Sequence, residues 1–228
     1  MKELAEGLGK TFPFSVLNKK DLDLVAEDAT AIEVKEGESL FNSGSPNDAI
    51  YLVLDGGVKL LRDNSARGKL VLEFFGPGEI VAAESILKDS AHRAEARPVG
   101  EAKVAKISLK VLRKLLEANS RFSQACIEMM TNQLFDCRER MESLVFQDVE
   151  ARLAGALVCL SKKFGKRDPK GTMISVKITH QDLSDYVAAS RETVSLCLGQ
   201  FRRKKLILTQ VRWLIVPDVK ALRKIAEA

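Results

Sequence analysis

The chain has 228 residues, with 36 Lys and Arg against 31 Asp and Glu, and a formal charge of +5. Its hydrophobic content of 46% and charged content of 29% are close to globular averages, which argues against disordered and fibrous classes. No apolar run approaches the roughly 18 residues of a membrane span, and the N-terminus lacks the apolar stretch of a secretory signal. We therefore expect a cytoplasmic protein with no membrane partner.

The charge is divided unevenly along the chain. Residues 1–149 carry 20 basic and 24 acidic side chains, a net −4, whereas residues 150–228 carry 16 basic and 7 acidic side chains, a net +9. A basic C-terminal third behind an acidic body indicates a nucleic-acid-binding module attached to a part with another task. A solvated lysine-rich surface would give the same totals, so the arrangement of the charges has to decide between the two.

The first half of the chain changes from helical to strand patterns. Leu and Val at helical spacing predict helices over residues 1–28, with Asn18 as the cap of a helix over 19–27. Many short strands with regularly placed glycine turns then predict a β-sandwich or jelly roll. A short helical run over residues 81–87 interrupts it. The expected strands are 30–34, 39–41, 49–54, 58–62, 69–75 and 102–107.

A long helix is predicted from residue 121 to about residue 149, after a shorter helix over 109–118 that Ser108 caps. Its apolar positions alternate in steps of three and four, which is typical of a heptad seam between two copies of one chain. Packing within one chain is the alternative. The predicted homodimer interface consists of Ile127, Met130, Leu134, Cys137, Met141 and Leu144.

The basic third of the chain contains the pattern of a helix-turn-helix. A second helix over 150–163, a basic turn at 166–171 and a strand at 173–178 lead up to it. The segment from Thr179 to Asp182 resembles a capping box that opens a helix ending at Val187. Ala188 and Ala189 form the turn, and Ser190 caps the next helix. Two strands over 206–208 and 213–216 are expected to form a wing.

The second helix of this motif has an inward apolar stripe and an open polar face. Arginine suits guanine O6 and N7, and glutamate accepts from cytosine N4, so Arg191 and Glu192 are expected to read bases in double-stranded DNA. The basic run that ends this helix and continues through Lys204 and Lys205 is expected to neutralise phosphates. The predicted DNA-binding residues are Ser190, Arg191, Glu192, Thr193, Ser195, Arg202 and Arg203.

Metal sites and catalysis find no support in the sequence. No two of the four cysteines have the C-x2-C or C-x4-C spacing of a metal-binding turn, which argues against a zinc site and an iron–sulfur cluster. A disulfide framework is not expected in a cytoplasmic protein. The sequence contains no P-loop, nucleophile elbow, zinc-protease or dinucleotide fingerprint, so we do not expect an enzyme.

Two motifs resemble transcription regulators of the Crp–Fnr family. The first is Gly37-x-x-Leu-Phe-x-x-Gly44 followed by Tyr51-Leu-Val-Leu-Asp-Gly-Gly-Val-Lys-Leu60, and the second runs from Thr179-His-Gln-Asp-Leu to Ala189-Ser-Arg-Glu-Thr-Val194. The resemblance implies an α+β chain with a cyclic-nucleotide-binding-like jelly roll over 1–120, a dimerisation helix over 121–149 and a winged helix-turn-helix over 150–228. It also implies a palindromic operator and RNA polymerase as a partner.

The chain departs from the family pattern in its reading helix. Leu196 stands where members often have a second arginine, so one base contact is expected to be lost or exchanged for contact with a thymine methyl group. Ala188 replaces the usual glycine of the turn, which is expected to shift the angle between the two helices slightly.

The effector is left open by the resemblance. It places Glu84 and Ser85, with Arg93 and Ala94, in a phosphate-binding cassette for a cyclic nucleotide such as cyclic AMP. However, Ala82-Ala83 replaces the usual aromatic–glycine pair, and Glu95 adds a like charge. A degenerate cassette, in which Glu84 and Arg93 only pair with each other, is the alternative.

Other sensing chemistries also remain open. Cys137 and Arg138 stand on the long helix where nucleotide-binding members contact the base, and Arg138 would also suit a dinucleotide or an acidic effector. His92 or a chain-terminal nitrogen could bind haem. Cys137 is expected to be a buried core cysteine, with a disulfide between two copies as the redox alternative. A cyclic-nucleotide module that acts on a partner protein is the competing function.

Overall fold

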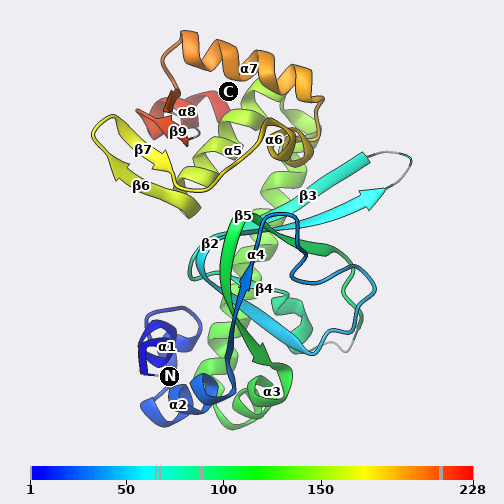
Figure 1. The fold of residues 1–228 in the computed structure, drawn as a ribbon, viewed down its shortest axis with the longest axis vertical. Helices are drawn as coiled ribbons and strands as arrows, with labels where there is room; N and C mark the ends of the chain where they lie inside the picture. The colour runs from blue at the N-terminus through cyan, green and yellow to red at the C-terminus, as the bar shows by residue number, and fades with distance from the viewer. Residues whose placement is uncertain (1, 65, 67, 88–89, 211–212, 228) are drawn as a thin grey trace.

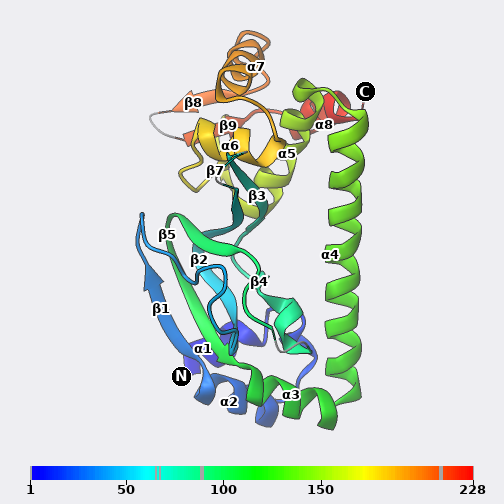
Figure 2. The same ribbon diagram turned by 90° about the vertical axis from the view of Figure 1, so that its right-hand side faces the viewer.

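The computed structural model describes residues 2–64, 66, 68–87, 90–210 and 213–227, and Figures 1 and 2 show it in two views. At the bottom of Figure 1 the chain begins with α1 (Lys2–Leu8), the 3-10 helix η1 (Phe14–Val16) and α2 (Lys19–Asp28). Asn18 caps α2 as predicted, since its side-chain oxygen accepts from the Asp21 amide at 3.0 Å.

The strands that follow form one antiparallel sheet in the order β1-β5-β2-β3, with β4 paired to β2. Their bounds are β1 (Thr30–Val34), β2 (Ala49–Asn64), β3 (Gly68–Phe75), β4 (Ile80–Val81) and β5 (Glu95–Ser108). Shifts of register along β2 bend it, and the sheet curls around a buried cluster that includes Phe41, Tyr51 and Val104. This β-roll confirms the predicted fold class for the first half of the chain.

Several predicted strand boundaries are wrong. The strands expected at 49–54 and 58–62 are one strand, because Asp55-Gly56-Gly57 forms bulges rather than a turn. Gly56 has a φ of +73°, and a Cβ atom there would lie 2.2 Å from the carbonyl oxygen of Glu101. The strand expected at 39–41 is only an isolated bridge between Phe41 and Ala96. Pairing with the long β2 starts β5 at Glu95 instead of residue 102.

Helices connect the roll to the C-terminal part of the chain. They are the 3-10 helix η2 (Ala83–Ile86), α3 (Leu109–Ala118), α4 (Ser120–Phe146) and α5 (Val149–Phe164). Helix α4 runs along one side of the whole molecule, and Figure 2 shows one of its faces uncovered. It ends at Phe146, because Gln147 is extended and Asp148 caps α5 through the Ala151 amide at 2.8 Å.

Helix α5 and residues 165–226 build a second, smaller unit at the top of Figure 1. Its sheet has the order β6-β7-β9-β8, so the predicted wing is present, although its first strand lies at 208–210 instead of 206–208. The basic turn expected at 166–171 lies in the β6–β7 hairpin, the strand expected at 173–178 ends at Ile174, and α8 was not predicted. The bounds are β6 (Gly165–Asp168), β7 (Gly171–Ile174), α6 (His180–Val187), α7 (Arg191–Arg203), β8 (Leu208–Gln210), β9 (Trp213–Val216) and α8 (Val219–Ala226).

The two units share one hydrophobic core. Leu61, Val71 and Phe74 of the β-roll lie in the same buried cluster as Leu153 of α5 and Leu183 of α6. Because this apolar surface is removed from water only when the units are docked, the cluster stabilises their relative orientation. None of the helices in the described part of the chain is long and apolar enough to cross a membrane.

Candidate nucleic-acid interface and effector site

The helix-turn-helix begins with the predicted capping box. The Thr179 hydroxyl accepts from the Asp182 amide at 3.0 Å, and the Asp182 carboxylate accepts from the Thr179 amide at 3.0 Å. At the other end of α6, Ala188 adopts the left-handed conformation with a φ of +52°. The alanine therefore takes the conformation that favours glycine, and the backbone turn forms despite the substitution.

Helix α7 starts at the predicted position and is anchored by the predicted residues. The Ser190 hydroxyl accepts from the Thr193 amide at 3.1 Å. Val194, Leu198 and Phe201 are fully buried in the shared core. With the apolar stripe facing inward, the opposite side of α7 forms the upper surface of the molecule in Figure 1, and no other element of the ribbon lies above it.

The side chains at the start of α7 differ in their exposure and in their hydrogen-bond partners. Arg191 and Glu192 are exposed, as a base-reading role requires. The pKa of Glu192 is lowered by hydrogen bonds to its carboxylate from the Glu192 backbone N–H and the Ser190 hydroxyl. The carboxylate therefore remains an anionic acceptor. Ser195 is half-buried. Its hydroxyl donates to the Arg191 carbonyl at 2.8 Å and lies 2.8 Å from Nδ1 of His180, so it is already engaged within the protein. Thr193 is half-buried as well.

Two further features of α7 bear on DNA contact. The Leu196 side chain is 69% exposed on this surface. At the far end Arg202 and Arg203 are exposed, whereas Lys204 forms an ion pair of 2.9 Å with Glu150 of α5. The predicted phosphate-binding run is therefore exposed, but one of its lysines is already paired.

A groove of about 1200 Å³ lies between the start of α7 and the β2–β3 hairpin of the roll. Arg62 and Lys69 line its hairpin wall, and Ser190, Arg191 and Glu192 line the opposite wall. The β-roll thus reaches the end of the helix that carries the base-reading candidates. This proximity was not predicted, because it depends on how the two units dock.

The structure places the predicted cassette residues around η2. The Ser85 hydroxyl is buried and accepts from the amide of Asn47, and Arg113 of α3 donates to the Ile86 carbonyl at 2.9 Å. Ala82, which precedes η2, has a left-handed φ of +62°, a conformation that costs an alanine energy. The cassette backbone is therefore held in a strained conformation by contacts from neighbouring elements.

The charged pair of the cassette is open to solvent. Glu84 and Arg93 are both exposed, and within the described residues no ion pair joins them, so the paired form of a degenerate cassette is not observed. The Glu95 carboxylate is paired with Arg97 at 2.6 Å and accepts from the Ser39 hydroxyl at 2.5 Å. Ala94 is buried.

His92 belongs to an aromatic stack inside the roll. Its ring lies parallel to that of Phe41, with centroids 3.6 Å apart, and Phe41 contacts Tyr51. Burial lowers the pKa of His92 and keeps the ring neutral, and its Nε2 atom has no hydrogen-bond partner within the described residues. Because His92 is only 5% exposed and this nitrogen is buried, an iron atom could reach it only if the surrounding side chains moved.

The predicted seam on α4 is exposed in part. Ile127, Leu134 and Met141 are 63%, 50% and 63% exposed, whereas Met130 and Leu144 are half-buried against their own chain. Val145 and Phe146, which the heptad pattern left out, are 72% and 84% exposed. The uncovered apolar face therefore lies slightly to one side of the predicted seam and extends to the C-terminal end of α4.

The expectation that Cys137 is buried is wrong, because it is exposed on this face of α4. Arg138 next to it is exposed too. In the described part of the chain neither side chain makes a hydrogen bond or an ion pair, so both are available to a ligand or to a second copy. Cys126 is the buried cysteine of α4.

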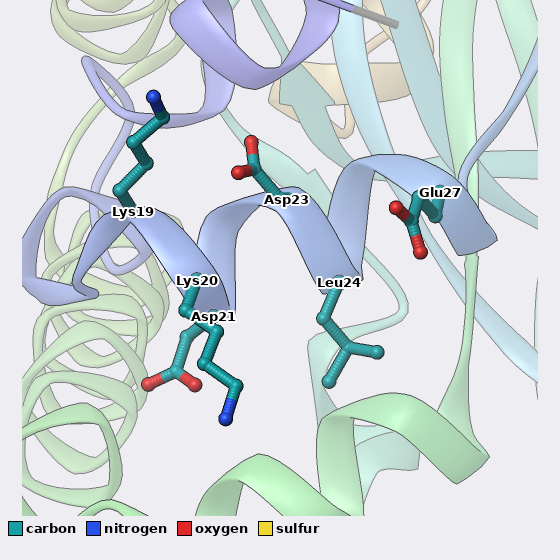
Figure 3. A pocket seen from close by; sticks show the side chains of 6 residues that line it. All are labelled: Lys19, Lys20, Asp21, Asp23, Leu24 and Glu27. Atoms are coloured by element: carbon teal, nitrogen blue, oxygen red, sulfur yellow. The ribbon is translucent and has the colours of Figure 1, made fainter.

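A further depression of about 570 Å³ lies on the surface of α2. Figure 3 shows that the side chains lining it all come from this helix and do not converge on a common point. Such a surface lacks the enclosed, convergent groups of a binding site. It therefore offers no alternative to η2 as the effector site.

An ionic cluster joins the β-roll to α5. Lys163 of α5 lies 2.6 Å from Glu79 and 3.6 Å from Glu73 of β3. Burial raises the pKa of Glu73 to about 7; Lys163 opposes the rise, while Glu79 and Asp136 add to it. Glu73 therefore takes up a proton on folding at mildly acidic pH.

The substitution Glu73→Gln is expected to flatten the pH dependence of stability. Because the pKa of Glu73 is higher in the folded state, the free energy of unfolding falls as the pH rises from about 4.5 to 7. Glutamine does not titrate, so the variant lacks this fall. As the pH rises from 5 to 8, we expect the free energy of unfolding of the variant to increase by about 1 kcal/mol relative to that of the wild type. This is less than the full pKa shift implies, because the carboxylate is partly exposed. Urea unfolding across this range measures the effect, and Glu101→Gln, at an exposed position of β5, is the control. Parallel curves for Glu73→Gln and wild type would contradict the assignment.

Comparison with known proteins agrees with this architecture. Residues 31–119 match the cyclic nucleotide-binding domain and residues 151–225 match the Crp-like helix-turn-helix domain. The chain is 23% identical over 193 residues to a CRP-like cAMP-activated global transcriptional regulator of Mycobacterium tuberculosis, covering 85% of this chain and 86% of that protein. It is 24% identical over 215 residues to the electron transport regulator A of Shewanella oneidensis, covering 94% of this chain and 85% of that protein.

A solved structure shows the same fold. FixK2 from Bradyrhizobium japonicum superposes with a TM-score of 0.78 at 19% identity, covering 88% of this chain and 98% of that chain. In this chain the two matched domains follow one another, and the long helix α4 lies between them. The chain belongs to the Crp–Fnr family and is an effector-responsive, DNA-binding transcription regulator.

Proposed function

We propose that two copies of the protein associate along α4 and bind a palindromic operator in the cytoplasm. The observation that carries this proposal is the start of α7, where a capped helix with a buried apolar side presents Arg191 and Glu192 at the outer surface. A helix end of this kind fits the major groove, and a two-fold dimer places two of them on one face of the duplex.

Each exposed side chain of α7 has a role in this proposal. Arg191 donates two hydrogen bonds to guanine, and Glu192 accepts one from cytosine. The exposed Leu196 contacts a thymine methyl group in place of a second arginine. Arg202 and Arg203 neutralise phosphates, while Ser190, Thr193 and Ser195 position the helix through caps and backbone contacts.

We further propose that an effector binds beside η2. Glu84, Ser85, Arg93 and Ala94 would contact its sugar and phosphate, and Cys137 and Arg138 its base. Two observations support a cyclic nucleotide: Glu84 and Arg93 are exposed and joined by no ion pair within the described residues, and the chain is similar to a cAMP-activated regulator. Binding would shift the hinge at residues 146–150 and thereby the two reading helices. The regulator would then act on RNA polymerase at the promoter.

DNA selection tests the proposed function directly. From a pool of random duplexes, the wild-type protein is expected to enrich two inverted half-sites whose centres lie about one helical turn, roughly 34–36 Å, apart. The logarithm of the affinity should fall linearly with the logarithm of salt concentration, by about 0.9 for each neutralised phosphate. Gel retardation from low to high salt measures this slope. No enrichment, or an affinity independent of salt, would contradict the proposal and favour a module that acts on a partner protein.

The effector site has its own test. Cyclic AMP or cyclic GMP is expected to raise the thermal unfolding temperature of the wild type, because a ligand that binds only the folded state stabilises it. The Arg93→Gln variant should lose this rise, since Arg93 supplies the charge that neutralises the cyclic phosphate. Arg121→Gln, an exposed change of the same kind on α4, should keep it. A rise that is the same in Arg93→Gln and wild type would exclude the cassette.

A further inference from the structure

Helix α6, the first helix of the helix-turn-helix, is held at its N-terminus by the β-roll. Lys59 of β2 forms an ion pair with the Asp182 carboxylate, whose other oxygen accepts from the amide and hydroxyl of Thr179 at 3.0 and 2.6 Å. Asp182 is only 6% exposed. The capping residue of α6 is thus also an attachment point for the other unit of the molecule.

The C-terminus of α6 is held by Arg140 of α4. Its guanidinium donates to the carbonyl of Tyr186 in α6 at 2.7 Å, and also to the carbonyls of Val71 at 2.6 Å and Leu72 in β3. The same group lies 4.0 Å from the centre of the Tyr186 ring. A guanidinium can join these groups because its donors point in several fixed directions within one plane. Arg140 therefore connects the long helix, the β-roll and the helix-turn-helix.

Apolar contacts cover these polar ones. The ring of Tyr186 packs against Phe74 of β3 with centroids 5.0 Å apart, and Phe74 is 1% exposed. Leu183 and Val187 of α6 are buried in the same cluster. The docked position of α6 is therefore stabilised by hydrogen bonds that are shielded from competing water.

The position of α6 determines the position of α7, the helix that carries Arg191 and Glu192. The two helices contact each other through the pair His180 and Ser195, whose side-chain atoms lie 2.8 Å apart. Arg152 of α5 donates to the Val187 carbonyl at 2.9 Å and to the Gln147 carbonyl at the hinge at 2.7 Å. Any rotation of α6 against α4 is thus transmitted to α7.

We propose that Arg140 is a positioning residue that sets the orientation of α7 relative to α4, and so the distance between half-sites that the dimer accepts. The inference rests on the proposed binding of two half-sites by a homodimer. Arg140 itself lies on the partly covered side of α4 and touches no base in this scheme. Its effect on DNA binding comes through the orientation of the helix-turn-helix alone.

The orientation of α7 is expected to affect the affinity for DNA with two half-sites, but not the affinity for a single half-site. When both reading helices are held at a fixed separation, binding of the first makes the second an intramolecular event with a high effective concentration. A helix-turn-helix that can rotate loses part of this advantage and tolerates other separations. Binding of one helix-turn-helix to an isolated half-site has no such dependence.

The test compares DNA duplexes with different spacers. The wild-type protein first selects its palindrome from random DNA, and duplexes are then made with the spacer lengthened or shortened by one and two base pairs, each step rotating one half-site by roughly 35°. A duplex with a single half-site completes the set. Affinities are measured for wild type, Arg140→Gln, Lys59→Gln and the control Arg121→Gln.

Arg140→Gln is expected to bind the selected palindrome about tenfold or more weakly, to bind the single half-site as the wild type does, and to depend less on spacer length. Lys59→Gln should shift binding in the same direction, and Arg121→Gln should match the wild type. If Arg140→Gln does not fold, Arg140→Lys replaces it, since an ammonium keeps the charge but lacks the donor fork that reaches both β3 and α6.

Two results would overturn the inference while leaving the proposed function intact. One is an equal loss of affinity for palindrome and single half-site, which indicates a merely structural role. The other is a spacer dependence in Arg140→Gln as steep as in the wild type. If the wild type selects no paired half-sites, the proposed function fails first and this inference fails with it.

Discussion

Replacing Leu134 by glutamate is expected to turn the protein into a monomer and to abolish binding to a two-half-site operator. Leu134 is 50% exposed near the middle of the uncovered apolar face of α4. In a two-fold interface each substitution occurs twice. The free energy of association from burying a large apolar side chain, about 1.5–3 kcal/mol, is therefore lost in both copies. The dimer should dissociate at least 100-fold more readily, at roughly 1.4 kcal/mol per factor of ten. Sedimentation equilibrium measures this directly.

The control introduces the same charge on the opposite side of the helix. Asn132 is exposed about half a turn away from Leu134, so Asn132→Glu should leave the dimer intact. Thermal unfolding of a Leu134→Glu monomer should resemble that of the wild type at high dilution, because the side chain is not part of the chain's own core. A Leu134→Glu protein that remains dimeric would show that the interface lies elsewhere.

Replacing Arg191 by alanine is expected to cost roughly 1–3 kcal/mol of DNA binding, or about 5- to 150-fold in affinity, and to relax the preference for one base pair. The reason is that a bidentate arginine–guanine contact discriminates bases as well as stabilising the complex. Its guanidinium is exposed and free to enter the groove. Affinities for the selected operator and for its three variants at the contacted position, four duplexes in all, measure the effect.

Arg202→Ala provides the comparison. A phosphate contact carries no sequence information, so this variant should bind all four duplexes more weakly by the same factor and reduce the salt slope by about one. A uniform loss for Arg191→Ala, with the base preference kept, would assign that side chain to the backbone instead. An unchanged affinity would remove it from the interface.

The helix-turn-helix could be predicted from the sequence almost residue by residue. Its caps are local, because Thr179 and Ser190 each satisfy amides three residues further along the chain. Its buried stripe follows from helical periodicity, which placed Val194, Leu198 and Phe201 in the core. Interactions of such short range have the same outcome whatever the rest of the chain does.

Predictions that depended on distant partners were less successful. The heptad pattern identified the exposed positions Ile127, Leu134 and Met141, but not that the chain's own packing half-buries Met130 and Leu144. Likewise, a glycine pair after residue 55 is typical of a turn, yet pairing with β5 turned it into bulges within one long strand. In both cases the neighbouring element, not the local pattern, determined the outcome.

The sequence alone was thus sufficient for the class of the protein, its reading helix and its basic C-terminal charge, because capping, periodicity and composition are properties of short stretches. The tertiary structure was needed for the contacts of Arg140 with Val71 and Tyr186, which are 69 and 46 residues away, and for that of Lys59 with Asp182, 123 residues away. Such contacts exist only after the two units have docked. In the proposed mechanism, the coupling between the effector site and α7 therefore depends on long-range contacts that no local sequence pattern encodes.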